Sequence, residues 1–272
     1  MKRKISDLSL TVLTWFFSAV TFAALLFLIG YILVKGIPNL SLSLFAWEYN
    51  SENVSLLPAM ITTVIMVILS LLVAVPLGLF TAIYLVEYAS RGNRLVKLVR
   101  VTAETLSGIP SIVYGLFGML FFVTALGWGF SLLAGTLTLS IMILPLIMRT
   151  AEESLKSVPD AFREGSFGLG AGRLRTVFKI VLPSAAPGIL AGVILAVGRI
   201  VGETAALIYT SGTVAKVPTM FSSGRTLAVH MYALSREGLY TGQAYATAVV
   251  LLVVVVGINA LSAALAKQIG RG

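Results

Sequence analysis

Six long apolar runs dominate this sequence, and they constrain its fold more than any other feature. The runs cover residues 10–34, 57–86, 105–126, 132–148, 185–211 and 244–266. A helix needs about 20 apolar residues to cross the hydrocarbon layer of a bilayer, which is close to the length of these runs. Strands of a membrane barrel would instead appear as alternating segments of about ten residues. We therefore predict an all-α membrane protein with about six transmembrane helices.

The composition agrees with lipid as the main solvent of this chain. Hydrophobic residues make up 58% and charged residues 11% of the 272 residues, and the mean hydropathy is +0.98. A soluble domain carries about 25% charged residues, so a soluble fold would lack polar surface here. The first run follows Lys2, Arg3 and Lys4, as in a signal peptide, but it is longer than a signal sequence and no small-residue cleavage site follows it. We expect this run to remain as a helix.

The basic residues are distributed unevenly between the two sides of the predicted membrane. Fifteen of the 20 Lys and Arg residues lie at the two termini, between the second and third runs, or between the fourth and fifth runs. Cytoplasmic segments carry such an excess, so we expect both termini and both connections in the cytoplasm. This asymmetry accounts for the net charge of +9, and no base-reading or stacking face indicates a nucleic-acid partner.

The chain has no cysteine and one histidine, His230. This excludes disulfides, thiolate sites and a multi-histidine metal centre built from this chain alone. The histidine lies in the predicted external connection 212–243, where we also predict a short helix near residues 226–235. We interpret it as an ordinary surface or packing residue. An intramembrane enzyme has little support, because no Ser/His pair or carboxylate pair lies at membrane depth.

The connection 149–183 is too long for a simple turn and too patterned for a linker. Ser157 is a candidate cap for a helix with Pro159 in its first turn. A second short amphipathic helix over residues 174–180 would follow, and Pro183 would close the unit before the fifth span. The turn between the two helices is marked by three glycines, Gly168, Gly170 and Gly172. The pattern predicts a helical hairpin that either docks on a partner protein or lies on the membrane surface.

Part of this connection carries a family pattern. Its fixed positions are Glu164, Gly165, Ser166, Gly170, Ile180, Leu182 and Pro183. Their spacing resembles the EAA loop of ABC importer permeases, the binding-protein-dependent type I permease family. Two alanines of that loop are replaced here by Gly165 and Ser166. The resemblance implies a location in a bacterial cytoplasmic membrane and a type I importer permease fold. In that fold these residues couple the chain to a separate cytoplasmic ATPase.

The resemblance also implies that ATP is hydrolysed by another subunit. A P-loop needs G-x-x-x-x-G-K-[ST] to hold phosphates, and neither Gly-Lys-Ser nor Gly-Lys-Thr occurs in this sequence. The expected partners are two cytoplasmic ATPase subunits, which bind ATP and magnesium, and a companion permease. We expect no cofactor and no metal bound by this chain.

Three further segments resemble parts of phosphate-specific permeases. Two of them are residues 107–115, SGIPSIVYG, and residues 198–206, GRIVGETAA. The third comprises Phe221, Ser222 and Ser223 with Arg225, Thr226, Leu227 and Tyr232, and it resembles the A-type subunit of the phosphate-specific transport system more than its C-type companion. The resemblance implies inorganic phosphate as cargo, a C-type permease as the partner in a heterodimer, and an external phosphate-binding protein.

Arg199 and Glu203 are the charged residues of the fifth run. Four residues apart, they would share one face of a continuous helix. A lone Arg at membrane depth costs about 2.5–3.5 kcal/mol, so the two either neutralise each other as a structural ion pair or form a transient anion site. In the second case the guanidinium would grip two phosphate oxygens while Glu203 competes for it and keeps the affinity low. The hydroxyls of Thr204, Ser107 and Ser111 can donate to the same anion.

These observations predict the permease subunit of an ATP-driven importer that moves phosphate by alternating access and catalyses no bond chemistry itself. Residues 1–56 would form the first helix and an external loop, residues 57–266 the permease domain, and residues 267–272 a cytoplasmic tail. One alternative keeps the architecture and changes the cargo to sulfate or molybdate, because Arg199 alone does not distinguish tetrahedral anions. Another is a secondary anion transporter working alone, which an inverted repeat would favour, but no such repeat is apparent in the sequence.

Overall fold

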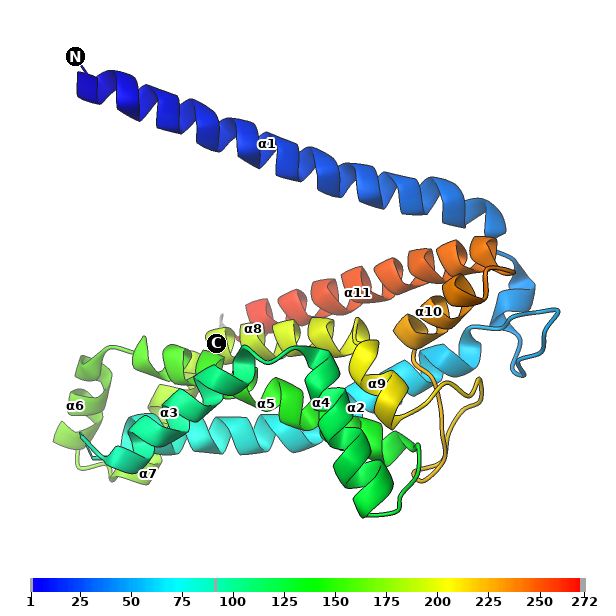
Figure 1. The fold of residues 1–272 in the computed structure, drawn as a ribbon. Coiled ribbons are helices and arrows are strands. Elements are labelled where there is room, and N and C mark those ends of the chain that lie inside the picture. Colours follow the sequence, from blue (N-terminus) through cyan, green and yellow to red (C-terminus); the bar gives the residue numbers. More distant parts are fainter. Residues whose placement is uncertain (1, 91, 270–272) are drawn as a thin grey trace.

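The computed structural model describes residues 2–90 and 92–269, and every regular element in these ranges is helical (Figure 1). The α-helices are α1 (Lys2–Gly36), α2 (Leu57–Ile83), α3 (Arg94–Ser107), α4 (Ser111–Gly118), α5 (Leu132–Lys156), α6 (Asp160–Gly168), α7 (Arg173–Thr176), α8 (Leu182–Val201), α9 (Ala205–Thr210), α10 (Leu227–Glu237) and α11 (Thr241–Ile269). Three π-helical turns, η3 (Tyr84–Tyr88), η4 (Met119–Ala125) and η5 (Val177–Val181), extend α2, α4 and α7. Two 3-10 turns, η1 (Ile37–Asn39) and η2 (Leu42–Phe45), follow α1. The predicted all-α fold is confirmed.

Within the described residues, five helices are long and apolar enough to cross a membrane, and one bent pair makes a sixth. The five are Leu10–Asn39, Leu57–Tyr88, Leu132–Lys156, Arg173–Val201 and Thr241–Leu261. The bent pair joins Arg94–Ser107 to Ser111–Ala125 at an angle of 103°. The predicted number of spans is confirmed, but the third run is not one straight helix from residue 105. Pro110 has no backbone N–H and forces extended geometry on its neighbour, so the helix ends and restarts there.

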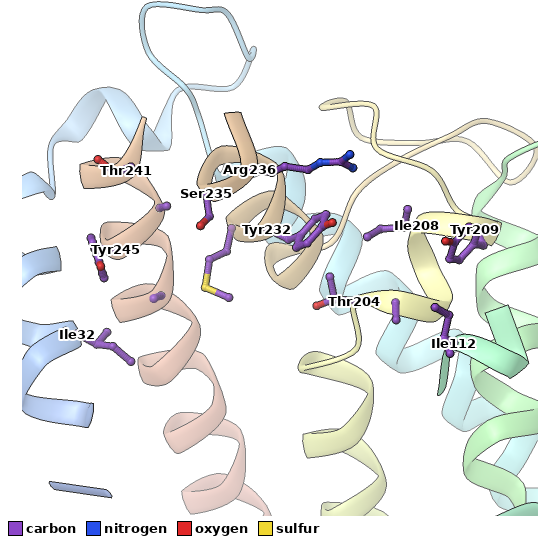
Figure 2. A pocket seen from close by; sticks show the side chains of 14 residues that line it. Ile32, Ile112, Thr204, Ile208, Tyr209, Tyr232, Ser235, Arg236, Thr241 and Tyr245 are labelled. Atoms are coloured by element: carbon purple, nitrogen blue, oxygen red, sulfur yellow. The ribbon is translucent and has the colours of Figure 1, made fainter. Parts of the chain in front are cut away.

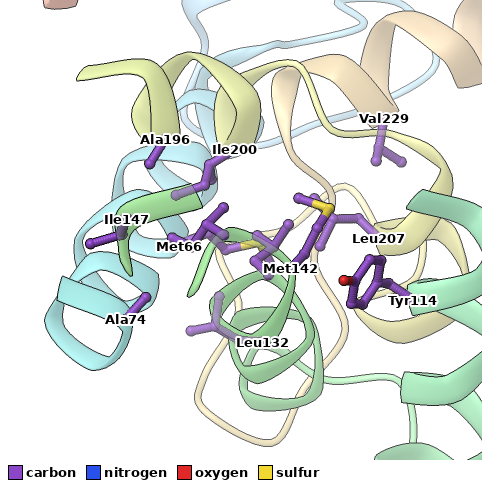
Figure 3. Close-up of a cluster of buried hydrophobic side chains, with 12 residues drawn as sticks. Met66, Ala74, Tyr114, Leu132, Met142, Ile147, Ala196, Ile200, Leu207 and Val229 are labelled. Carbon is purple, nitrogen blue, oxygen red and sulfur yellow. The ribbon is translucent and has the colours of Figure 1, made fainter. Parts of the chain in front are cut away.

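The central helix of the bundle is α5, which packs against α2 on one side and α8 on the other. Figure 3 shows the main core, where Met66 of α2, Met142 of α5 and Ile200 of α8 meet side chains from α4, α9 and α10. These elements are far apart in the sequence. Their shared core therefore positions the end of α8, where the charged residues of the fifth run lie, relative to α2, α4, α5, α9 and α10.

The fifth span begins earlier than predicted, because one continuous helix runs from Arg173 to Val201. Pro183 lies in the first turn of α8. Because α8 continues a longer helix, the proline ring at this position would clash with the carbonyl of the residue four positions earlier. The π turn η5 directly before it relieves this clash, since Leu182 N–H donates to Val177 O and the turn is wider. The prediction that Pro183 closes the hairpin before the span is therefore wrong. The second helix of the hairpin continues into the span.

The two ends of the bundle carry different structures (Figure 1). At one end, which we call the hairpin end, α6 and α7 form a helical hairpin. At the other, which we call the loop end, α10 lies beside the segments 37–56 and 212–226. The predicted short external helix is confirmed as α10, and Thr226 caps it by accepting a hydrogen bond from Val229 N–H.

The first helix, α1, is the least packed span of the chain. Its contacts are made near its C-terminal end, where the rings of Tyr31 and Tyr245 lie 5.8 Å apart and Gly36 lies against Tyr245 and Val249. Figure 1 shows α1 diverging from the bundle toward its N-terminus, and its residues from 10 to 28 are exposed. Most of α1 is therefore left for lipid or another chain to cover.

Candidate functional site

A three-residue break separates α8 from α9 within the fifth run. Residues 202–204 are not helical, and the carboxylate of Glu203 accepts a hydrogen bond from Ala206 N–H at 3.0 Å. Glu203 is buried, and it satisfies one of the donors that a helix start leaves unpaired. The prediction of one continuous helix over residues 185–211 is wrong at this point, because the buried carboxylate starts a new helix.

Arg199 lies half-buried in the last turn of α8. No ion pair joins it to Glu203 in the described part of the chain, where the ion pairs involve other residues. The interpretation as an intrahelical ion pair is therefore wrong. Gly198 and Gly202 flank the arginine, and a side chain added at either would meet no atom of another element. Open space thus lies beside a guanidinium that Glu203 does not hold.

One stripe along the end of α8 and its C-cap is left largely uncovered by the rest of the chain. Ala191, Leu195 and Gly202 are exposed, and with Arg199 they recur at the three- and four-residue spacing of one helix face. In a membrane such a face must be covered by lipid, by a second subunit or by an aqueous path. Arg199 is the charged residue on this face.

Tyr114 connects the bend between α3 and α4 to Arg199. Its hydroxyl donates to Leu106 O at 2.8 Å across the bend, and the guanidinium of Arg199 acts on it electrostatically. The hydroxyl of Ser107 donates to Glu104 O at 2.8 Å, and Ser111 begins α4 half-buried. Within the described residues no hydrogen bond joins either serine to Arg199. Tyr114, which was not among the predicted site residues, thus fastens the bend within electrostatic range of Arg199.

A cavity of about 720 Å³ opens at the loop end beside the α8–α9 break (Figure 2). Its walls come from α1, α4, α9, α10 and α11, and its polar lining residues are Thr204, Tyr209, Tyr232, Ser235, Arg236, Thr241 and Tyr245. Thr204 is the one predicted substrate-path residue among the residues that line it. Arg199, Glu203, Ser107 and Ser111 lie outside its lining. The cavity and Arg199 therefore both lie next to the α8–α9 break, but they do not form one closed site.

The predicted coupling residues lie in the hairpin and at the start of α8. Glu164 and Gly165 are exposed on α6, and nothing lies where a side chain at Gly165 would point. Ser166 is buried, and its hydroxyl lies 2.8 Å from the hydroxyl of Thr176 on α7. Gly170 has a φ of +81°, which glycine adopts without strain, so it forms the turn between the helices. The replacement of alanine by Ser166 thus adds a polar bond across the hairpin.

The remaining coupling positions, Ile180 and Leu182, are half-buried at the base of the hairpin, and Pro183 is exposed. The predicted role of Ser157 as a helix cap is wrong. Ser157 ends α5, where its hydroxyl donates to Ser154 O at 2.8 Å, and Pro159 takes the cap position of α6. Because α5 extends to Lys156, residue 157 ends this helix and does not begin the next one.

The hairpin exposes apolar side chains that its own bundle does not cover. They are Phe162, Phe167, Leu169, Leu174 and Phe178, and we call them the apolar hairpin surface. Leu169 at the tip is 92% exposed. Apolar residues gathered on one exposed surface typically mark an interaction site.

At the loop end, Arg225 and His230 form a buried cluster that the sequence did not reveal. Arg225 is 5% exposed, and its guanidinium carbon lies 4.7 Å from the centre of the Tyr49 ring. His230 packs edge-on against the same ring and is fully buried. Burial, followed by the charge of Arg225, lowers the pKa of His230 to about 3. The histidine is therefore a neutral packing residue. Among the described residues, no three His, Cys, Asp or Glu side chains gather as a metal site.

Sequence comparison relates this chain to membrane transport proteins. The pattern of the family described as "Binding-protein-dependent transport system inner membrane component" matches residues 74–271. The probable ABC transporter permease protein YqgI of Bacillus subtilis is 32% identical over 255 residues, which are 88% of this chain and 86% of that protein. The phosphate transport system permease protein PstA of Pasteurella multocida is 37% identical over 210 residues, covering 75% and 72% of the two chains.

The fold resembles that of a solved ABC transporter chain. In the crystal structure of a bacterial alginate ABC transporter in complex with an alginate pentasaccharide-bound periplasmic protein, one chain aligns with a TM-score of 0.63 and 19% identity. The alignment covers 92% of this chain and 95% of the other. At this identity the likeness concerns the fold.

Proposed function

This chain belongs to the family of binding-protein-dependent transport system inner membrane components, the permease subunits of ABC importers, and we propose that its cargo is inorganic phosphate. The phosphate transport permease of Pasteurella multocida supports this cargo, since it is similar over three quarters of this chain. The structural observation that carries the proposal is Arg199, a guanidinium on the uncovered face of α8 that no carboxylate of the described chain neutralises.

The chemistry of Arg199 suits a phosphate passing through a membrane pathway. The planar fork of an arginine can donate two parallel hydrogen bonds to phosphate oxygens. Glu203 lies buried four residues further on, and its negative charge opposes tight anion binding. Conduction requires a site that is weak enough to release its ion. Thr204, which lines the cavity at the loop end, and Ser107 and Ser111 at the bend are the hydroxyls proposed to guide the anion.

The proposed orientation places the hairpin end in the cytoplasm and the loop end outside, with both termini cytoplasmic. An external phosphate-binding protein delivers its ligand at the loop end, and a C-type permease supplies the other half of the pathway. Two ATPases, which hold ATP and magnesium, complete the importer, and one of them docks on the apolar hairpin surface around Glu164 of this chain. Their closure moves the hairpin, and the continuous helix from Arg173 to Val201 passes that movement to the α8–α9 break. This subunit itself does not hydrolyse ATP.

Uptake by the reconstituted importer tests this proposal. The chain, its companion permease, the ATPases and the binding protein are placed in proteoliposomes, and uptake of labelled phosphate is measured with and without excess sulfate. We expect ATP-dependent phosphate uptake that sulfate does not reduce. Vesicles without the ATPases are the control, and uptake by them would indicate a secondary transporter. Competition by sulfate as effective as by unlabelled phosphate would overturn the assignment of the cargo.

A further inference from the structure

The helix that carries Glu164, α6, has little apolar contact with the membrane helices. Its buried residue is Ser166, whose hydroxyl bonds to Thr176 within the hairpin itself. The polar contacts of Arg163, whose side chain is 14% exposed, therefore fasten α6 to the bundle.

Arg163 bonds to two other elements and to the linker that precedes its own helix. Its Nε and Nη2 atoms donate to the carboxylate of Glu87 at 3.1 and 2.7 Å. Nη2 also donates to Leu155 O at 2.9 Å, and Nη1 donates to Val158 O at 2.7 Å. Leu155 lies in the last turn of α5, where a helix leaves its carbonyls unpaired and favours a cation. The guanidinium thus joins α6, the end of α5 and the π turn η3 at the end of α2.

The bond between Arg163 and Glu87 is largely buried, and the arginine in it is always charged. The side chain of Glu87 is 8% exposed. Its hydrogen bond raises the pKa of Arg163 further above an already high value, so the guanidinium stays charged at every physiological pH. A carboxylate at this depth would be costly without its partner. The hairpin therefore does not separate from η3 without breaking a strong contact.

A second contact joins the same π turn to the other helix of the hairpin. The guanidinium carbon of Arg173 on α7 lies 5.5 Å from the centre of the Tyr88 ring in η3, a cation–π geometry. On its other side η3 packs through Leu85 against Val96 and Ala103 of α3. The turn η3 is thus attached to both hairpin helices and to the helix that leads into the bend at Pro110.

We propose that Arg163 and Glu87 are positioning residues that make α2 and α3 move together with the hairpin, in parallel with the continuous helix into α8. This inference rests on the proposed function, since partner ATPases supply the movement. Without the bond to Glu87, the hairpin would act on the bundle mainly through its attachments to α5 and α8. The Arg163–Glu87 bond obliges the opposite helix to follow, so both walls of the bundle respond to one ATPase.

The test compares Glu87→Gln with Asp160→Asn in the complete importer in proteoliposomes. Glu87→Gln keeps the size of the side chain and removes its charge. Asp160 bonds the same guanidinium at 3.2 Å, but its side chain is 82% exposed, and an exposed pair contributes little. Phosphate uptake and ATP hydrolysis are measured on the same vesicles. Glu87→Asp serves as the conservative variant, and Arg163→Lys, which keeps the charge without the two-point contact, is used if Glu87→Gln does not assemble.

For Glu87→Gln we expect normal assembly and ATP hydrolysis, with phosphate transported per ATP lowered about tenfold, the size of an ordinary coupling between sites. Glu87→Asp should restore part of this ratio, and Asp160→Asn should leave it unchanged. An unchanged ratio in Glu87→Gln would overturn the proposal. So would poor assembly with a normal ratio in the complexes that form, because the pair would then be purely structural. If the wild-type importer carries sulfate instead, the proposed cargo fails, and the same ratio measured with sulfate still tests the link.

Discussion

Two arginine–glutamate pairs in this chain have opposite arrangements. At the hairpin end, Arg163 reaches across 76 positions of sequence to bond Glu87 at 2.7 Å. In the fifth run, Arg199 and Glu203 are neighbours in sequence, yet within the described chain no ion pair joins them. Glu203 instead caps α9 through Ala206 N–H. The two residues that are close in the sequence therefore form no ion pair, whereas the two that are distant in the sequence do.

The difference shows how the same two residue types serve two purposes. An arginine whose donors are satisfied inside the chain fixes one element against another. An arginine left without a carboxylate, on a face that the chain does not cover, keeps its donors available for an anion. The distinction is testable, because the two arginines should respond differently to the same substitutions.

The largest expected effect is on transport by Arg199→Gln. We expect phosphate uptake to fall at least about 1,000-fold, since losing a charged partner at a desolvated site costs several kcal/mol. The amount of assembled importer in the membrane, measured in parallel, should stay the same. Arg199→Lys keeps the charge without the fork and should give an intermediate rate. Uptake near the wild-type level would remove Arg199 from the pathway.

The next effect concerns stability and is expected for the other arginine. Arg163→Ala leaves the buried Glu87 without a partner, and the free energy of unfolding should fall by about 3 kcal/mol. Arg199→Ala breaks no ion pair of the described chain, so the loss should stay below about 1 kcal/mol. Denaturant unfolding of the chain in detergent measures both. Equal losses of the free energy of unfolding would mean that the two arginines do not differ in their structural role.

Glu164→Lys tests the hairpin that Arg163 positions. The side chain is exposed, so the stability of the chain should not change, whereas a reversed charge on the docking face should lower transport-coupled ATP hydrolysis about tenfold. The control is Glu153→Lys, which reverses the charge of an exposed residue of α5 at the same end of the bundle. ATP hydrolysis stimulated by the loaded binding protein is the measurement. A similar response in both variants would argue against a docking role for Glu164.

A third arginine, Arg225, faces a ring and a histidine instead of a carboxylate. Because burial and Arg225 lower the pKa of His230 to about 3 in the folded state, the unfolded chain binds a proton first, near pH 6.5. The free energy of unfolding should therefore be constant above about pH 6.5 and fall below it, by up to about 1.4 kcal/mol per pH unit. His230→Phe should remove this slope in thermal unfolding between pH 6.5 and 5. The same slope in the variant would assign it to other groups.

The smallest effect is expected for Glu203→Gln. The amide oxygen can still accept from Ala206 N–H, so the stability should change by less than about 0.5 kcal/mol. Removing the charge near Arg199 should lower the KM for phosphate about threefold. A KM that rises instead would show that Glu203 assists binding of the anion.

The sequence was informative wherever a local pattern decides the structure. Continuous apolar runs predicted the spans, and the glycines of residues 168–172 with the fixed spacing from Glu164 to Pro183 predicted the hairpin, in whose turn Gly170 is left-handed. The short helix near residues 226–235 was predicted in the same way. The bend at Pro110 depends on a single residue as well, although the run over residues 105–126 was interpreted as one helix.

The sequence was not informative where tertiary contacts override the local pattern. Helical spacing continues through residues 202–204, and the break there depends on a carboxylate that is buried only in the assembled bundle. The bond from Arg163 to Glu87 and the stacking of Arg225 on Tyr49 join segments that no short-range pattern relates. The roles of the predicted substrate-path residues remain predictions.

The unbroken helix from Arg173 to Val201 has a mechanical consequence. At about 1.5 Å per residue, the guanidinium of Arg199 sits roughly 39 Å from the first turn of α7. If the base pivots by about 10°, a lever arm of that length sweeps its far end through about 7 Å. A small rocking motion of the ATPases would then be magnified into a stroke longer than the reach of any hydrogen bond.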